Sequence, residues 1–111
     1  VSRAEVYKDA FAITIFDGEG LESPTIGGAK AANQLLDISG IKASFVITAY
    51  NDTIYISARS IDEVNVQLVM EKLGGGGHMS IAGAQLKDMT PEQAVNKIKQ
   101  TLDSMLAEGE I

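Results

Sequence analysis

A run of glycines followed by the only histidine of the chain is the sequence feature best suited to binding chemistry. Gly74, Gly75, Gly76 and Gly77 directly precede His78. Consecutive glycines cost conformational entropy on ordering and bury no side chain, but their unhindered backbone N–H groups can converge on an anion such as a phosphate. The histidine would add a hydrogen bond, or a charge when protonated. The run therefore predicts a phosphate cradle, with a flexible connector as the alternative.

Two neighbouring residues upstream are candidates for the same site. Arg59, one of two arginines, lies at the end of a predicted strand, where its fork of donors suits a phosphate. An ion pair at the surface is the alternative interpretation of Arg59. Ser60 follows it and either assists at the phosphate or caps the next helix. The predicted substrate-binding residues are thus Arg59, Ser60, Gly74, Gly75, Gly76, Gly77 and His78.

The chain does not contain the parts of a complete catalytic centre. It has no cysteine, so disulfides, thiolate metal sites and cysteine nucleophiles are excluded. With a single histidine, a metal centre would need carboxylates almost alone, and no Gly-x-Ser-x-Gly turn presents a nucleophilic serine. The glycine run is not a nucleoside-triphosphate loop, because no Gly-Lys-Ser/Thr follows it. We therefore predict neither catalytic residues nor metal ligands in this chain.

Length and charge limit the class of protein and of partner. The 111 residues are enough for one domain with a substantial core, and 45% hydrophobic residues are typical of a globular protein. The net charge of −6 and the lack of a basic segment argue against binding to long duplex nucleic acid. No apolar run is long enough for a membrane span, so no membrane contact is expected. The start at Val1, without a methionine or signal peptide, favours a piece of a longer protein.

Periodicity predicts the elements that position these residues. Runs of β-branched and aromatic residues predict strands over 11–17, 43–50 and 53–57. Apolar residues at helical spacing predict helices over 25–39, 60–73 and 90–106.

Capping signals mark two of the helix starts. The second helix would begin with a capping box over 60–63, and the third begins at Thr90 with Pro91 at its first position. Asn65 either orders the turn or faces water. The segment 81–86 fits a strand or a short helix. The predicted order is β-α-β-β-α-(β)-α, an α/β (α+β) fold with a mixed β-sheet flanked by helices.

Taken together, these motifs resemble a known family. The motif residues are Ala58-Arg59-Ser60, Asn65, the glycine run with His78, and Ala82-Gly83. Their spacing is similar to that of the DHH-associated domain, the C-terminal partner of the Asp-His-His phosphoesterase superfamily. Residues 33–46 also fit the helix-to-strand crossing of that family, and residues 64–78 are most similar to the membrane-anchored, GdpP-type cyclic-di-AMP phosphodiesterases. Ile81 departs from the pattern, because many members of the superfamily carry alanine there.

The resemblance implies a division of labour between two domains. In that family the preceding Asp-His-His domain holds two metal ions, usually manganese, and the associated domain grips the nucleotide phosphate from the other side of the cleft. By motif match, Arg59 would pair with phosphate oxygens, Ser60 would assist, and Gly75–Gly77 with His78 would line the same pocket. This chain has no Asp-His-His motif. It would therefore be the substrate-binding half of a manganese-dependent phosphodiesterase.

The resemblance also implies the partners of the chain. These are the DHH catalytic domain of the same protein and a substrate that is cyclic-di-AMP or a short oligonucleotide. The domain would lie on the cytoplasmic side of a protein anchored through upstream segments. The alternative is a stand-alone nucleic-acid-binding module of an exonuclease-like or tRNA-editing-like protein.

Overall fold

The computed structural model describes residues 4–16, 24–50, 52–61 and 64–111. In this part of the chain, strands and helices follow one another in the order β1 (Glu5–Tyr7), β2 (Phe11–Phe16), α1 (Pro24–Leu35), β3 (Ala43–Tyr50), β4 (Thr53–Ser60), α2 (Val66–Lys72), β5 (Gly76–Gly77), β6 (Ile81–Lys87) and α3 (Pro91–Ala107).

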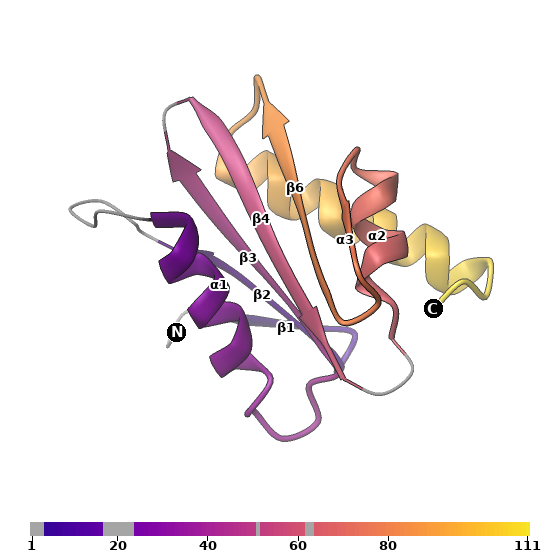
Figure 1. Cartoon of the computed structure of the whole chain (residues 1–111). Coiled ribbons are helices and arrows are strands. Elements are labelled where there is room, and N and C mark those ends of the chain that lie inside the picture. The colour runs from indigo at the N-terminus through magenta and orange to yellow at the C-terminus, as the bar shows by residue number, and fades with distance from the viewer. Residues whose placement is uncertain (1–3, 17–23, 51, 62–63) are drawn as a thin grey trace.

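The strands form one mixed sheet in the order β1-β2-β3-β4-β6-β5. Strands β2 and β3 are parallel and are joined through α1, whereas every other neighbouring pair is antiparallel. Helix α1 lies on one face of the sheet, and α2 and α3 lie on the other (Figure 1). The predicted α+β class with a mixed sheet flanked by helices is confirmed.

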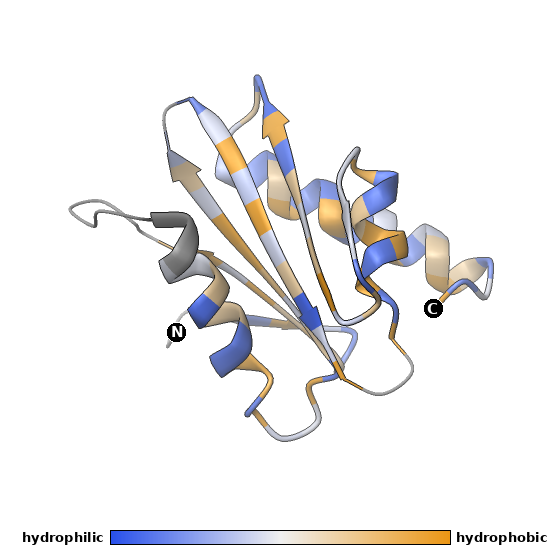
Figure 2. Cartoon of the chain, viewed as in Figure 1, coloured by the Kyte–Doolittle hydropathy of each residue, from blue (hydrophilic) through white to orange (hydrophobic). Residues whose placement is uncertain are grey.

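The alternation of side chains along β4 gives the sheet two different faces, and the hydropathy bands in Figure 2 follow it. Ile54, Ile56 and Ala58 are buried in the main core, while Tyr55 and Ser57 between them are only partly buried. Successive side chains on a strand point to opposite faces. We call the face that packs against α2 and α3 the core face, and the opposite face the open face.

Helix α1 covers only part of the open face. Its Ala31, Ala32 and Leu35 pack against Ala12 of β2 and Val46 of β3 in a second, smaller core. The helix can lie this close to the sheet because Gly28 has no side chain: a Cβ there would be 2.6 Å from Thr48 Oγ1. Helix α1 also reaches β4, since a Cβ on Gly28 would be 3.7 Å from Ser57 Oγ. The open face over β6 is left without a covering helix in Figure 1.

The start of the second helix was predicted wrongly. Ser60 is the last residue of β4 and pairs with Ala43, so it cannot cap a helix. Residues 62 and 63 of the expected capping box lie outside the described residues. Helix α2 begins at Val66, and Asn65 is its N-cap, with Oδ1 accepting from the N–H groups of Gln67 and Leu68.

Three further differences concern the extent of elements. Helix α1 ends at Leu35 rather than at residue 39, because turns begin there. The ambiguous segment 81–86 is strand β6, whose alternate residues Ala82, Ala84 and Leu86 are buried. The short edge strands β1 and β5 were not predicted, since two or three residues give no periodicity.

Candidate functional site

Arg59 and His78 lie in one row across the open face of the sheet. Arg59 of β4 is opposite Ile81 of β6, and the backbone N–H of His78 donates to the Ile81 carbonyl at 2.7 Å. Directly opposed residues of antiparallel strands point to the same face. With about 4.8 Å between strands, the Cα atoms of Arg59 and His78 are about 10 Å apart, with Ile81 between them. Their side chains can therefore reach one phosphate group from two sides.

Arg59 is held in a half-buried position without an acidic partner among the described residues. Its Nη1 donates to the carbonyl of Ala58 at 2.8 Å. No described carboxylate forms an ion pair with it. Burial lowers the pKa of the guanidinium from its usual value. A desolvated cation with spare donors is a candidate anion-binding group.

The first two glycines of the run do not contribute main-chain donors to the predicted cradle. The N–H of Gly74 donates to Glu71 O at 3.1 Å, and that of Gly75 donates to Met70 O at 2.8 Å. Gly76 lies opposite Gly83 in the ladder between β5 and β6. Since the Gly74 and Gly75 donors are already used within the chain, they cannot converge on an anion. The predicted role of the amides is therefore wrong for Gly74 and Gly75, and for Gly76 and Gly77 it stays a prediction.

Close packing against β6 explains the glycines instead. A Cβ on Gly75 would lie 2.7 Å from Ala84 Cα and closer still to the Gly83 carbonyl oxygen. A Cβ on Gly77, whose φ is +145°, would lie 2.5 Å from Ala82 Cα. Both contacts are with backbone, which cannot move aside as a flexible side chain can. The glycines therefore let the edge strand lie against β6 and place His78 beside Ile81.

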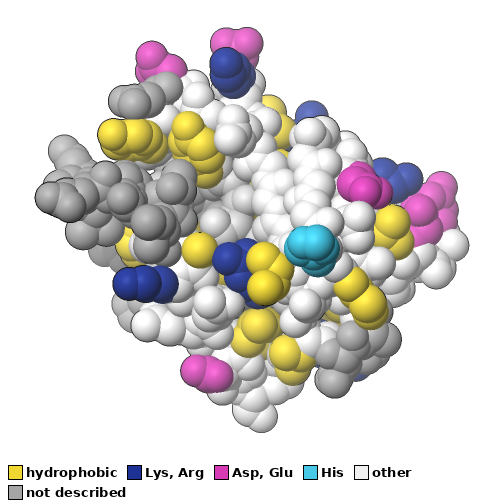
Figure 3. Space-filling model, viewed as in Figure 1, with side chains coloured by type: hydrophobic (Ala, Val, Ile, Leu, Met, Phe, Trp, Pro, Cys, Tyr) yellow, Lys and Arg dark blue, Asp and Glu magenta, His cyan; other side chains and the backbone are white. Residues whose placement is uncertain are grey.

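A groove with a floor of small residues adjoins the row of Arg59 and His78. Its volume is about 560 Å³, and its lining residues come from β4, β6 and the glycine bend: Tyr55, Ile56, Ser57, Gly74, Gly75, Gly83, Ala84 and Gln85. In Figure 3 the histidine (cyan) lies beside basic and hydrophobic side chains, at the border of a broad white area of backbone and side chains that are neither charged nor hydrophobic. The groove, which Gly74 and Gly75 help to line, and the row of Arg59 and His78 thus lie side by side on the open face.

The sequence motifs did not identify the groove residues of β4 and β6. Tyr55 and Ser57 on β4 share a face with Gly83 and Gln85 on β6 because they are register partners. The signal was present in the alternation of both strands, since every second residue of β4 and of β6 is buried. It could not be used because 81–86 was not assigned to a strand.

Ser60 does not join this site. Its side chain is buried on the core face, and its Oγ donates to the carbonyl of Met79 at 3.2 Å. Its backbone N–H donates to the carbonyl of Ser80 at 3.0 Å. Met79 and Ser80 form the turn between His78 and Ile81. Ser60 is therefore a positioning residue that fixes this turn beside Arg59.

We expect Ser60→Ala to lower the free energy of unfolding by about 1 kcal/mol, the usual net value of one hydrogen bond. The loss stays small because the Met79 carbonyl also accepts from the N–H of Val66 at 2.9 Å. Urea unfolding measures it. Ser80→Ala is the matched control, since it removes an exposed hydroxyl from the same turn. Equal losses in the two variants would contradict the role of Ser60.

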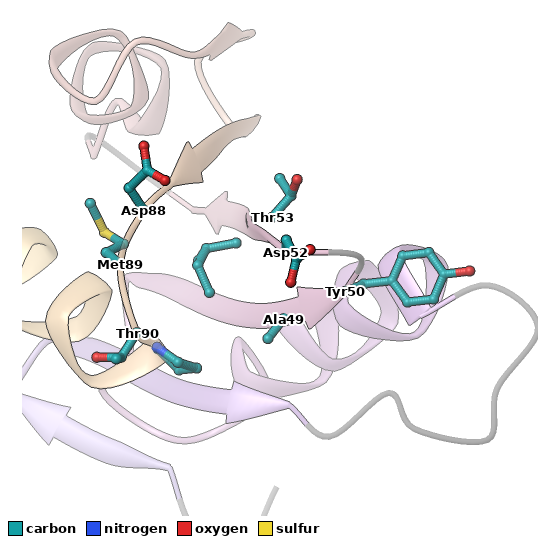
Figure 4. Close-up of a pocket in the computed structure, with 9 residues that line it drawn as sticks. Ala49, Tyr50, Asp52, Thr53, Asp88, Met89 and Thr90 are labelled. Carbon is teal, nitrogen blue, oxygen red and sulfur yellow. The ribbon is translucent and has the colours of Figure 1, made fainter.

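A larger pocket of about 740 Å³ lies at the other end of the sheet. It is formed by the turn between β3 and β4 and by the segment between β6 and α3. Asp52 and Asp88 line it from these two segments, and Tyr50 points away from the others (Figure 4). Two carboxylates repel a phosphate. This pocket is therefore not the anion site, although it is the larger one.

Two kinds of feature are absent from the described part of the chain. It contains no group of three or more His, Asp or Glu side chains placed to hold a metal ion. Nor does any helix within those residues combine the length and the apolar character of a membrane span.

Comparisons with known proteins agree with the motif analysis. A family model described as the DHHA1 domain matches residues 12–108. Cyclic-di-AMP phosphodiesterase PdeA of Listeria monocytogenes is 45% identical over 105 residues, which cover 94% of this chain and 16% of that protein. Cyclic-di-AMP phosphodiesterase GdpP of Bacillus subtilis is 36% identical over 111 residues, covering 98% of this chain and 17% of that protein.

A solved structure shows the same fold. The exopolyphosphatase-related protein from Bacteroides fragilis matches with a TM-score of 0.79 and 24% identity, over 94% of this chain and 32% of its own. The chain spans about a sixth of the length of the two curated relatives. The family model covers nearly all of the chain and its motif residues, so this protein belongs to the DHHA1 domain family.

Proposed function

We propose that this chain is the substrate-binding domain of a metal-dependent phosphodiesterase, and that it grips a nucleotide phosphate between Arg59 and His78. The observation that carries the proposal is their placement in one row of the open face of the sheet, next to a groove with a floor of small residues. The substrate class is cyclic-di-AMP or a short oligonucleotide.

The environment of Arg59 supports a binding role. Arg59 is partly buried without a carboxylate partner among the described residues, and such burial penalises a charged group in the folded protein. A half-buried cation of this kind makes little contribution to folding, whereas a phosphate oxygen would supply the missing partner. The planar fork of donors can form two parallel hydrogen bonds with a phosphate.

The names of the relatives support the substrate class. Two proteins that share 36–45% identity with nearly the whole chain are named cyclic-di-AMP phosphodiesterases. They are much longer than this chain, so the hydrolytic activity of a whole protein is part of the proposal. The partner domain would be a DHH domain of the same protein. In such a protein this domain would lie on the cytoplasmic side, and any membrane anchor would belong to other segments.

The residues of this chain would act by holding and orienting the phosphate. Arg59 would donate to non-bridging oxygens and offset charge that develops as the phosphorus is attacked. His78 would donate a hydrogen bond from the other side of Ile81. Manganese ions, which in this proposal belong to the DHH domain, would supply the activated water. Fixing the phosphate relative to that water would lower the entropic part of the barrier.

Solution NMR of the 111-residue chain tests whether Arg59 and His78 bind the phosphate. We expect linear di-adenylate at millimolar concentration to shift the side-chain signals of Arg59 and His78 and the backbone amides of Gly76 and Gly77. Asp88, in the acidic pocket at the other end of the sheet, provides the internal control and should not shift. Shifts at Asp88 with none at His78 would contradict the proposal.

A further inference from the structure

The open face continues from the row of Arg59 and His78 into two further rows of residues. In the next row, Ser57 lies opposite Gly83, which in turn lies opposite Gly76. In the row beyond, Tyr55 lies opposite Gln85. The middle row carries only one hydroxymethyl group and two hydrogens as side chains. Helix α1 comes near it at Ser57, where a Cβ on Gly28 would be 3.7 Å from Ser57 Oγ, so a ligand can lie directly on the sheet over Gly83 and Gly76.

The spacing of these rows matches the parts of a nucleotide. Neighbouring rows on one face are two residues apart, which is about 7 Å along a strand. The row of Tyr55 is thus about 13 Å from the row of Arg59, counted between Cα atoms. A phosphate held at the row of Arg59 would place its ribose over the small-residue row and its base near Tyr55 and Gln85.

The chemistry of the last row fits a base better than a sugar or a second phosphate. Tyr55 is only partly buried, and its ring can stack on the face of a base. Gln85 is exposed, and its amide can donate to and accept from one base edge, as glutamine does with adenine. Neither side chain forms a hydrogen bond with the described residues. Both are therefore available to a ligand.

We infer that Tyr55 and Gln85 form the nucleobase subsite of this domain, with adenine as the base that the amide suits best. The inference rests on the proposed function, because the phosphate at Arg59 and His78 sets the position of the base. It goes further in assigning recognition of the base to two residues of β4 and β6. It also gives the groove of about 560 Å³ a specific occupant.

Binding of two phosphate ligands to the 111-residue chain separates the two proposals. Adenosine 5′-monophosphate carries a base, and ribose 5-phosphate carries the same phosphate and sugar without it. By NMR titration we expect the first ligand to bind about tenfold tighter, since stacking and an amide pair together contribute at least on this scale. Tyr55→Leu and Gln85→Met should each reduce that ratio to about threefold or less.

Matched controls isolate the subsite from general effects. Tyr50→Leu removes a tyrosine that is 43% exposed and lies near the far end of the sheet. Gln100→Met removes an exposed glutamine from α3. Both controls should keep the tenfold ratio. An unchanged ratio in Tyr55→Leu and Gln85→Met would overturn the subsite.

Two further outcomes separate the base subsite at Tyr55 and Gln85 from the phosphate site at Arg59 and His78. Equal affinities of the two ligands, with shifts at Arg59 and His78, would overturn the base subsite but support phosphate binding by Arg59 and His78. Absence of shifts at Arg59 and His78 with either ligand would overturn the proposed phosphate binding and, with it, the base subsite.

Discussion

Arg59→Ala, made in the longer phosphodiesterase to which we propose this domain belongs, should lower kcat/KM for cyclic-di-AMP about a hundredfold. The variant removes a charged donor from a half-buried position that has no described carboxylate to compensate it. Manganese content should stay unchanged, since the proposal places no metal ligand in this domain. Folding should change little, because burial of this charge already disfavours the folded state. Steady-state kinetics, metal analysis and urea unfolding measure the three quantities.

Two further variants give this prediction its controls. Arg59→Lys keeps the charge but loses the fork of donors, so its kcat/KM should fall between wild type and Arg59→Ala. Lys87→Ala removes a positive charge from the same open face, about 20 Å along the strands from Arg59. It should leave kcat/KM unchanged. Equal losses in Lys87→Ala and Arg59→Ala would mean that only the overall charge of the face matters.

Gly75→Ala should lower the free energy of unfolding of the 111-residue chain by about 3 kcal/mol, at the upper end of the usual cost of overpacking. The new methyl group would meet the backbone of β6, with Ala84 Cα at 2.7 Å. Since β5 must then move away from β6, the turn that holds His78 should move with it. Urea unfolding measures the first effect, and the shift of the His78 amide signal in NMR spectra measures the second.

Gly76→Ala is the matched control for this variant, because it adds the same methyl group one residue away. A Cβ on Gly76 would have no atom within 4 Å. We expect a change of at most about 0.5 kcal/mol, as for an ordinary surface substitution. If the glycine run were only a flexible connector, both substitutions would have similar small effects. A large loss at Gly75 alone supports close packing.

Elements with local signals could be predicted well from the sequence. Helix α3 begins where the Thr90-Pro91 signal predicts, and its capping box with Gln93 is present in the structure. The strand over 43–50 was also correct. In these cases the signal lies within a few residues of the element that it specifies.

The sequence predictions were wrong or incomplete where the structure of a residue depends on contacts with residues distant in the sequence. Ser60 carries a local capping motif, but pairing with Ala43 on β3 extends the strand through it. The glycine run indicates close approach of some kind, but the sequence does not say that the approaching group is the backbone of β6. The placement of Arg59 and His78 beside each other likewise depends on Ile81, which lies between them only in the folded sheet.

The ends of the sheet have a consequence for association between copies of the molecule. One edge is the two-residue strand β5, and the other is the three-residue strand β1. Exposed strand edges are templates on which further chains add and aggregate. Edges this short offer few unpaired backbone groups, and Glu5 of β1 is engaged by Lys99 at 2.5 Å. The sheet therefore resists growth into intermolecular fibres, even though one of its broad faces has no covering helix over β6.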